Sequence, residues 1–390
     1  MIVWEGGFMV DVFMIDFKVR KAEDNINARL PKLFNESGLG DIIDKGDIVA
    51  VKVHMGEEGN FTHIRPIHVR IIVEEIKKLG GVPFVTDTTG VGLDRPRGTA
   101  VGYLRVAASH GFTSETVGAP IIIADGLKGL SGVKVKVNGK VIKEVEIGQA
   151  IAEADCLISL AHFKGHPRTG FGGALKNIGM GCVTKSGKAQ NHLKMKPYVK
   201  SEPCNGCGKC VDFCPVDAIE MVNGKAKIDR EKCVWGCGCW AICPEEAISS
   251  WGEMHRDPEE FCIAVVETVL AVVNYFGKDK VGYMNFLYDI TAHCDCFPFS
   301  DNPFVPNIGV LASRDPVAID KASLDLVNQA PGLPYSVAEE LGALEKGSDK
   351  FSKITMIEYL NRFPPVDPLT TLKYAKEYGL GETEYSLVKI

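Results

Sequence analysis

The sequence lacks two features that would each point to a particular class of protein. It has no excess of basic residues: 44 Lys and Arg stand against 50 Asp and Glu, which gives a formal net charge of −6. Nucleic-acid binders usually have the opposite balance, so a role in binding DNA or RNA is not expected. No apolar stretch reaches the length of a transmembrane helix, so no membrane span is expected either.

A secretion signal is also missing from the amino-terminal residues. They are apolar in places, but Glu5, Asp11 and Asp16 interrupt them and no basic segment precedes them, which is unlike a signal peptide. Thirteen cysteines without such a signal indicate a reducing compartment, where clustered thiols bind metal more often than they form disulfides. We therefore expect a cytoplasmic protein, long enough at 390 residues for two or three domains.

Most of the cysteines form two runs, and each run ends in a Cys-Pro step. The first run has the spacing C-x2-C-x2-C-x3-C-P, in which three thiolates of one tight loop hold three irons of a cube. In two-cluster ferredoxins the fourth cysteine of each run binds the other cluster. The sequence therefore predicts two [4Fe–4S] clusters, the first held by Cys204, Cys207, Cys210 and Cys243 and the second by Cys233, Cys237, Cys239 and Cys214.

The second run departs from the regular spacing. Gly236 occupies the position of the second ligand and Cys237 follows one residue late, although Cys233 to Cys239 spans the usual length. Because glycine tolerates unusual backbone conformations, we expect a distorted loop that still provides all four ligands. If Cys237 does not reach the iron, the second site holds a three-ligand, labile or substrate-accessible cluster instead. A zinc ribbon needs only four ligands in two pairs and would not explain two Cys-Pro steps.

Strand and helix patterns alternate on both sides of the cysteine runs. The expected strands cover residues 48–53, 82–85, 121–123, 156–160, 282–287 and 308–312. The expected helices cover residues 67–79, 258–276 and 316–327. We therefore predict an α/β fold, a sheet with flanking helices, interrupted by an inserted ferredoxin-like α+β domain. The expected boundaries are residues 1–200 and 251–390 for the two parts of the α/β domain and 201–250 for the insert.

Two connecting segments have patterns of their own. Residues 133–147 alternate around Asn138-Gly139, a dipeptide favoured in type I′ turns, which predicts a β-hairpin that projects from the α/β body. Residues 185–200 contain five lysines and Pro197 with little hydrophobic content. This composition predicts an exposed connector into the insert, and the alternative is a docking face for an acidic partner.

Polar residues follow almost every expected strand, at the edge where open α/β sheets bind ligands. Asp315 precedes Pro316 and a helix, so we expect it to cap that helix. We expect a cationic pocket that binds a small anionic substrate, and structural histidines are the alternative; the pocket would consist of His162, Lys164, His166, Arg168 and Lys176. The catalytic candidates are His54, His162, Lys164, His166 and Lys176.

A second thiol-rich segment lies outside the ferredoxin-like runs. His293-Cys294-Asp295-Cys296 places four potential ligands in four residues, and Cys182 is another thiol in a glycine-rich stretch. Thiolates and imidazole suit zinc, copper(I) or an iron–sulfur species. We predict a metal or redox role for Cys294 and Cys296, with His293 or Cys182 completing a third metal site. The alternative is that these are buried free cysteines.

Motifs along nearly the whole chain resemble the DUF362 family of iron–sulfur proteins. They are Val51–Gly56, Thr86–Thr88, Ala124–Gly126, His162–His166, Lys176–Cys182 and His293–Cys296. The resemblance includes the ferredoxin insert and implies an iron–sulfur α/β protein, but it leaves the reaction open. The segment around Ile64-Arg65-Pro66 also resembles the amino-terminal domain of nickel-pincer lactate racemase.

Together these patterns predict an iron–sulfur oxidoreductase or electron-transfer protein. Its two clusters would exchange electrons between a redox partner and a site in the α/β body. One alternative is a metal- or cofactor-handling maturation factor, in which the thiol and histidine loop holds a transferable metal. The other is a ferredoxin-like subunit of a larger redox complex.

Overall fold

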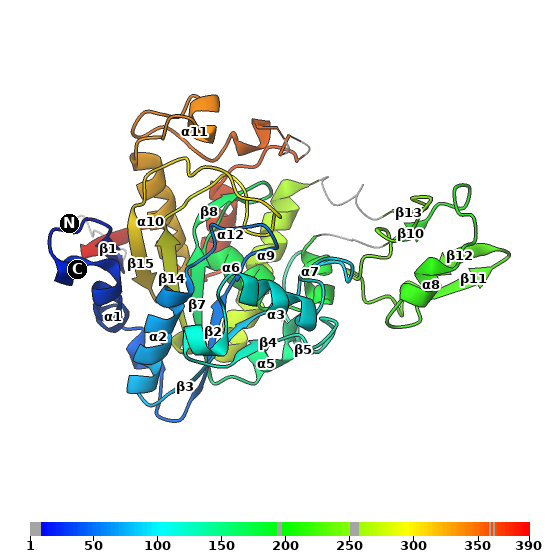
Figure 1. Cartoon of the computed structure of the whole chain (residues 1–390), viewed down its shortest axis with the longest axis horizontal. Helices are drawn as coiled ribbons and strands as arrows, with labels where there is room; N and C mark the ends of the chain where they lie inside the picture. The colour runs from blue at the N-terminus through cyan, green and yellow to red at the C-terminus, as the bar shows by residue number, and fades with distance from the viewer. Residues whose placement is uncertain (1–8, 193–196, 250–256, 359, 362) are drawn as a thin grey trace, which may run out of the picture.

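The computed structural model describes residues 9–192, 197–249, 257–358, 360–361 and 363–390. Its centre is an eight-stranded sheet (Figure 1). In spatial order the strands are β16 (Tyr385–Lys389), β1 (Val10–Asp16), β15 (Gly309–Ser313), β14 (Val281–Leu287), β7 (Cys156–His162), β2 (Ile48–Val53), β3 (Val82–Asp87) and β4 (Ile121–Ile123). Neighbouring strands are parallel except at β15, which is antiparallel to both β14 and β1.

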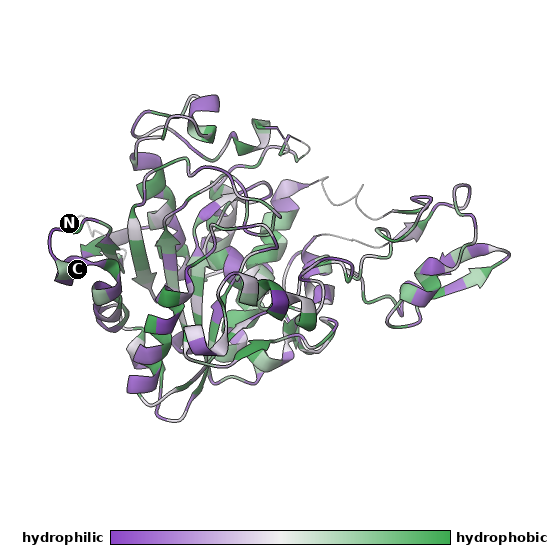
Figure 2. Ribbon diagram, in the orientation of Figure 1, coloured by the Kyte–Doolittle hydropathy of each residue, from purple (hydrophilic) through white to green (hydrophobic). Residues whose placement is uncertain are grey.

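Helices cover both faces of this sheet (Figure 1). One face carries α1 (Ile26–Glu36), α2 (Pro66–Lys78), α3 (Ala100–Ser109) and α4 (Ser114–Val117). The other carries α6 (Ala174–Gly181), α9 (Pro258–Phe276), α10 (Pro316–Gln329) and α12 (Leu369–Glu377). Successive side chains of a strand point to opposite faces, so Val49 and Val51 join one core and Ala50 joins the other. Figure 2 shows the resulting apolar interior.

The cysteine-rich insert forms a smaller lobe on the side of the molecule away from β1 and β16 (Figure 1). It contains the short helix α8 (Lys209–Phe213) and two antiparallel pairs of strands. The pairs are β10 (Tyr198–Val199) with β13 (Ile248–Ser249), and β11 (Ile219–Val222) with β12 (Lys225–Ile228). Ile219, Ala247 and Ile248 pack with buried cysteines in a core of its own.

The remaining short elements surround the sheet. They are β5 (Gly132–Lys136), β6 (Glu144–Gly148), α5 (Gln149–Ala152), β8 (Lys164–His166), β9 (Gly170–Gly172), α7 (Lys185–Asn191) and α11 (Val337–Glu340). No helix within the described ranges combines the length and apolarity that a bilayer crossing requires.

The α/β class and the expected strands and helices are confirmed, with ends that differ by a few residues at most. The start signals explain this agreement. Pro66, Pro258 and Pro316 each occupy the first turn of a helix, where proline fits without loss of a hydrogen bond. Asp315 caps α10 as predicted, because its carboxylate accepts hydrogen bonds from the backbone amides of Val317 and Ala318, both at 2.8 Å.

The hairpin is present, but its predicted turn is wrong. Strands β5 and β6 pair in a register that sets Lys136 opposite Glu144 and leaves residues 137–143 as a longer loop. The reason is a long-range contact: the buried carboxylate of Glu267 in α9 accepts hydrogen bonds from the backbone amides of Val141 and Ile142, at 3.0 and 2.6 Å. The hairpin therefore packs on α9 instead of projecting.

The prediction of an exposed connector is wrong for residues 185–191. These residues form helix α7, in which the side chains of Lys185 and Lys188 are buried. The Lys185 amine donates to the Gly90 carbonyl at 2.6 Å, and the Lys188 amine donates to the Val183 carbonyl at 2.7 Å. Buried amines with such partners behave as part of the core, which a composition rich in lysine does not indicate. Residues 193–196 of the segment lie outside the described residues.

Candidate functional site

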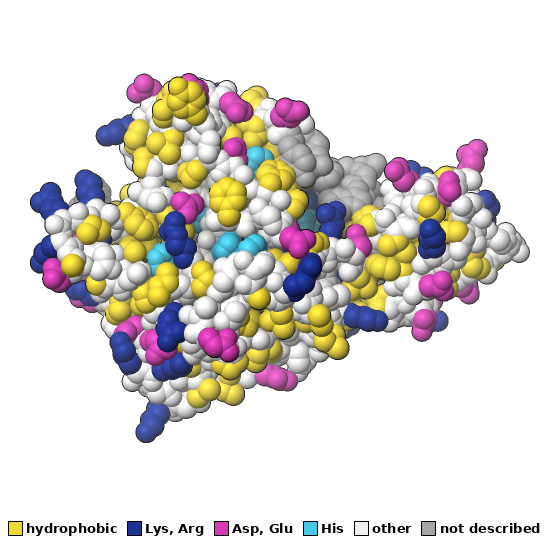
Figure 3. Space-filling view, in the orientation of Figure 1, with side chains coloured by type: hydrophobic (Ala, Val, Ile, Leu, Met, Phe, Trp, Pro, Cys, Tyr) yellow, Lys and Arg dark blue, Asp and Glu magenta, His cyan; other side chains and the backbone are white. Residues whose placement is uncertain are grey.

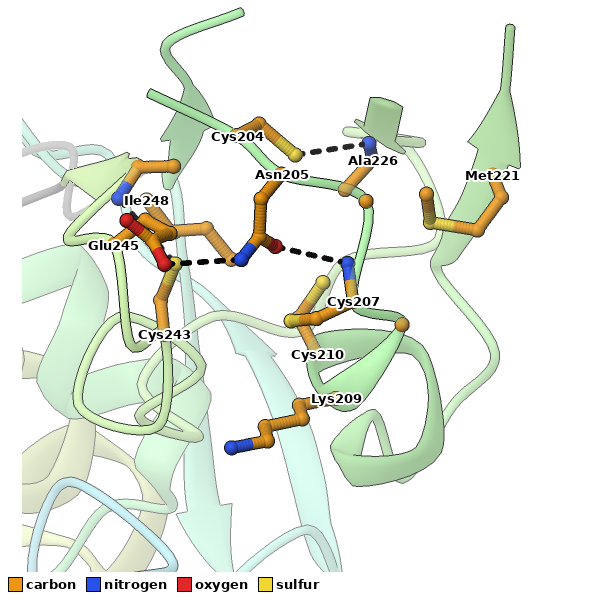
Figure 4. A pocket seen from close by; sticks show the side chains of 13 residues that line it. Cys204, Asn205, Cys207, Lys209, Cys210, Met221, Ala226, Cys243, Glu245 and Ile248 are labelled. Atoms are coloured by element: carbon orange, nitrogen blue, oxygen red, sulfur yellow. Dashed lines mark hydrogen bonds between the residues drawn. The ribbon is translucent and has the colours of Figure 1, made fainter. Parts of the chain in front are cut away.

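The first cysteine pocket lies within the insert (Figure 4). Three cysteines of the first run and the last cysteine of the second run line it: Cys204, Cys207, Cys210 and Cys243. The Ala226 amide donates to the Cys204 sulfur at 3.5 Å, and this bond and one from the Gly206 amide lower the pKa of the Cys204 thiol. Asn205 orders the loop by accepting from the Cys207 amide at 3.0 Å and donating to Glu245 at 2.9 Å. Cys207 is exposed.

The second cysteine pocket has the complementary set of thiols. Cys233, Cys237 and Cys239 of the second run and Cys214 of the first run line it, together with apolar residues that include Trp235 and Trp240. Burial in these surroundings raises the pKa of Cys237 and of Cys239 to about 12. A metal cluster would therefore have to supply the positive charge that keeps these thiols ionised.

The two pockets repeat one local geometry. Each run ends in a Cys-Pro-x-x-Ala segment in which the alanine amide donates to the cysteine sulfur, from Ala218 to Cys214 at 3.2 Å and from Ala247 to Cys243 at 3.3 Å. Such amide-to-sulfur bonds stabilise thiolates and tune cluster potentials. Both pockets therefore contain a cysteine sulfur that accepts a hydrogen bond from an alanine amide, Cys243 in the first and Cys214 in the second.

The irregular loop of the second run docks on the α/β body. The Gly92 amide donates to the Gly236 carbonyl at 2.8 Å, and the Leu93 amide donates to the Cys237 carbonyl at 2.7 Å. Gly236 and Gly238 both adopt positive φ, at 70° and 95°. A side chain at Gly236 would meet the carbonyl oxygen of Lys185 at 2.8 Å. The late position of Cys237 thus belongs to a loop shaped by its contact with the body.

Apolar packing adds to this docking contact. The rings of Trp235 and Trp240 pack on Ala189 of α7, beside Val91. Helix α7, which the lysine-rich composition led us to expect as an exposed connector, therefore supports the second cysteine loop. We call residues 90–97, which lie between this loop and the sheet edge, the bridging loop.

A second polar site lies at the carboxyl ends of β2, β7 and β14. Its anchor is Asp295, which is fully buried and lies 2.9 Å from the Nδ1 atom of His162 and 3.2 Å from the Lys164 amine. Although burial acts to raise the pKa of Asp295, the charges of His162 and Lys164 hold it well below its usual range. The His162 Nε2 atom donates to the Tyr288 carbonyl at 2.8 Å. Both ring nitrogens are therefore engaged, and His162 positions Asp295.

Cys294 and Cys296 flank this anchor. Their sulfur atoms lie 2.8 Å apart, with Cys296 donating to Cys294, and the Lys176 amine lies 3.9 Å from the Cys294 sulfur. The hydrogen bond from Cys296 lowers the pKa of Cys294 well below its usual value. Burial acts to raise this pKa, and the charges of Lys176 and Lys164 act to lower it further. The same bond raises the pKa of Cys296. Cys294 is buried and Cys296 is exposed.

The charges of this site also act on two of the other candidate histidines: Asp295 and Lys164 act on His54, and Lys176 and Lys164 act on His166. His54 follows β2, accepts from the Gly56 amide at 3.0 Å, and has its pKa lowered by burial and by the charge of Arg97. His166 is buried against the Thr169 hydroxyl at 2.9 Å, and burial also lowers its pKa. His293 packs on the rings of Phe297 and Phe299. Histidine side chains reach the surface on the face of the body shown in Figure 3.

Cys182, the other predicted ligand, belongs to a different network. It is fully buried at the end of α6, where the charges of Lys52, Asp87 and Lys188 act on it and where burial raises its pKa to about 12. Lys52 and Asp87 form a buried ion pair at 3.2 Å. The structure therefore brings Lys164, Lys176, Cys294 and Cys296 together, whereas Cys182 contacts other charged groups.

Sequence reasoning missed two residues of this site. The Arg97 guanidinium lies 3.0 Å from the Glu57 carboxylate in a buried ion pair, and its charge acts on the Cys296 thiol. The Glu57 amide donates to the Asp295 carbonyl at 3.0 Å. This hydrogen bond ties the segment 294–296 to the loop that follows β2. Neither residue falls on a periodic or spaced motif, so only the fold reveals them.

Comparisons with known proteins cover both parts of the molecule. The chain is 52% identical over 46 residues to a subunit of an ion-translocating oxidoreductase complex from Methanosarcina acetivorans, which is 12% of this chain and 17% of that protein. It is 36% identical over 67 residues to a ferredoxin of Alicyclobacillus acidocaldarius, 17% of this chain and 86% of that protein. These lengths are close to that of the cysteine-rich insert.

A solved structure similar to this one is the lactate racemase apoprotein from Thermoanaerobacterium thermosaccharolyticum, with a TM-score of 0.39 and 15% identity over 78% of this chain and 57% of that chain. The chain thus spans 17% of the oxidoreductase subunit and little more than half of the racemase. The model of the family described as a domain of unknown function, DUF362, matches residues 49–325, which is most of the chain and includes the insert. The chain therefore belongs to the DUF362 family and carries a ferredoxin-type iron–sulfur domain within it.

Proposed function

We propose that this protein is an iron–sulfur oxidoreductase in which two [4Fe–4S] clusters pass electrons between a redox partner and a site in the α/β body. One observation carries the proposal: each of two pockets is lined by four cysteines, three from one run and one from the other. This crossed arrangement is that of two-cluster ferredoxins. The proposed ligands are Cys204, Cys207, Cys210 and Cys243 for the first cluster and Cys233, Cys237, Cys239 and Cys214 for the second.

The positions of the pockets support a direction for the electrons. The first pocket is lined only by residues of the insert and includes the exposed Cys207, so a redox partner can approach it. The second pocket contacts the bridging loop through the hydrogen bond from Leu93 to Cys237. That loop ends at Arg97, whose charge acts on Cys296. Electrons would enter at the first cluster and leave from the second toward the end of β14.

The receiving site is suited to an anion. Lys164, Lys176 and Arg97 surround the two thiols, and Asp295 is the acid that balances Lys164. Positive groups next to a reducible site attract anionic substrates and stabilise thiolates. We assign the protein to the reducing interior of the cell. In an oxidising compartment Cys294, Cys296 and the exposed cluster ligand Cys207 would tend to form disulfides.

Iron analysis of anaerobically prepared variants tests the cluster assignment. The protein should contain about eight irons, as two cubanes require. Cys207→Ala and Cys237→Ala should each lower this to about four irons, with loss of one of two cluster signals in electron paramagnetic resonance. Cys262→Ala, which removes a buried thiol of α9 outside both pockets, is the control and should retain all the iron.

Two results would contradict the proposal. Wild-type protein without iron after anaerobic reconstitution would remove its basis. Full iron content in Cys237→Ala would show that this thiol is not a ligand and that the irregular run holds its cluster with three cysteines.

A further inference from the structure

We propose that Cys294 and Cys296 form a redox-active dithiol that reduces a small anionic disulfide. The inference rests on the proposed function for its source of electrons, because the two clusters would supply them. It assigns the chemistry of the receiving site and the class of substrate, which the cluster assignment alone does not give.

The geometry of the pair carries the proposal. The two sulfur atoms lie 2.8 Å apart, so a disulfide between them needs only a small movement of the side chains. The segment that bears them is held from both sides: the Asp295 carboxylate contacts His162 and Lys164, and the Asp295 carbonyl accepts from the Glu57 amide. A pair fixed in this way remains close together in both redox states.

The unequal exposure of the two sulfurs divides their roles. Cys296 is exposed and can attack a substrate, whereas Cys294 is 2% exposed and can reach only Cys296. In the resting pair Cys296 carries the proton and donates it to Cys294. For Cys296 to act as the nucleophile, this proton passes to the Cys294 sulfur along the hydrogen bond that already joins the two.

The charges around the pair suit thiol chemistry on an anionic substrate. Lys176 lies 3.9 Å from Cys294, Lys164 also acts on Cys294, and Arg97 acts on Cys296. Asp295 balances Lys164 and Glu57 pairs with Arg97, so the net effect of these groups is a modest positive field. Such a field stabilises a thiolate and attracts a bound anion.

The reaction balances as two steps. Cys296 attacks one sulfur of the substrate disulfide and releases one thiol; Cys294 then attacks the Cys296 sulfur and releases the second thiol, which leaves a Cys294–Cys296 disulfide. The substrate has gained two electrons, and the products take up the proton of the pair and one from solvent. Two electrons, which the clusters would supply, and one proton from solvent then restore the thiol and the thiolate.

The test is an anaerobic reductive titration with iron analysis on the same samples. Oxidised wild-type protein should take up about two more electrons than Cys294→Ser or Cys296→Ser, because a disulfide is a two-electron couple. Oxidised glutathione, an anionic disulfide, should be reduced by the wild type with reduced viologen as donor and not by either variant. Cys182→Ser, which changes a buried thiol outside the pair, should match the wild type in both assays.

The outcomes separate this inference from the proposed function. Full iron content with equal electron uptake by wild type and both variants would overturn the dithiol and leave the clusters in place. Loss of iron or zinc in Cys294→Ser would overturn it in favour of a third metal site. Absence of clusters from the wild type would instead contradict the proposed function. Mass spectrometry of the alkylated, oxidised wild type provides a second measurement, since the peptide with both cysteines should resist alkylation.

Discussion

Gly236→Ala is expected to loosen the contact between the second cysteine loop and the α/β body. Gly236 has a φ of 70°, a conformation in which a residue with a β-carbon costs about 1–2 kcal/mol. The added carbon would also lie 2.8 Å from the Lys185 carbonyl oxygen, which belongs to the backbone of α7 and has to shift. Forcing an atom into a packed contact costs about 1–3 kcal/mol. The total is therefore about 2–5 kcal/mol.

Gly208→Ala is the matched control. Gly208 lies in the loop of the first cysteine run with a φ of 76°, but an added carbon there meets no atom within 4 Å. It should therefore show the backbone cost of about 1–2 kcal/mol without the cost of the contact. The difference between the two variants, about 1–3 kcal/mol, isolates the docking of the second loop.

Release of iron to a chelator under anaerobic conditions measures this difference. If iron leaves from a locally opened loop, about 1–3 kcal/mol corresponds to about a 5- to 150-fold faster release, because about 1.4 kcal/mol equals a factor of ten. In Gly236→Ala about half of the iron should leave at the faster rate. Equal acceleration in Gly236→Ala and Gly208→Ala would refute the argument, since it would mean that contact with Lys185 adds nothing.

Two further predictions concern buried charges in the α/β body. Burial and the charge of Arg65 lower the pKa of His68 to about 4 in the folded protein, whereas the ordinary value in the unfolded chain is near 6.5. The unfolded chain therefore binds the proton more readily, and the free energy of unfolding falls as the pH drops from 6.5 toward 4. Between pH 7 and pH 5 protonation of His68 should lower the free energy of unfolding by about 2 kcal/mol. Urea unfolding of His68→Phe should lack this part of the pH dependence. The same dependence of the unfolding free energy on pH in His68→Phe and wild type would contradict the prediction. Lys52→Met should lower the free energy of unfolding by about 3–5 kcal/mol, because it leaves the buried Asp87 carboxylate without its cation. Adding Asp87→Asn should restore part of the loss in the same assay, and a cost below about 1 kcal/mol for the single variant would contradict the reasoning.

Much of the fold depends on signals that are local in the sequence. Pro258 and Asp257 define the start of α9, since proline fits the first turn and the aspartate caps it. The spacing of the cysteine runs is local in the same sense, because the loop that holds each set of thiols is only a few residues long. The crossing of Cys214 and Cys243 between the pockets followed from the repeated Cys-Pro step.

The contacts that sequence reasoning missed join residues far apart in the chain. The amide of Leu93 meets the carbonyl of Cys237, and Glu267 of α9 opens the turn between β5 and β6. Backbone amides have no sequence signature, and a single glutamate in an apolar helix does not indicate its partner. Lys185 was assigned to the surface for the same reason, since the carbonyl that accepts its hydrogen bond belongs to residue 90.

The antiparallel strand β15 brings β1 and β16 to the edge of the sheet that lies away from the insert (Figure 1). Strand β1 pairs with β15, and β16 pairs with β1 in a register that sets Val10 opposite Tyr385 and Met14 opposite Lys389. A tag fused after β16 can therefore attach the protein to an electrode with its iron–sulfur lobe facing the solution. Voltammetry on such a film would address the lobe through soluble mediators, whereas attachment through a cysteine of the lobe would block the face proposed for the electron donor.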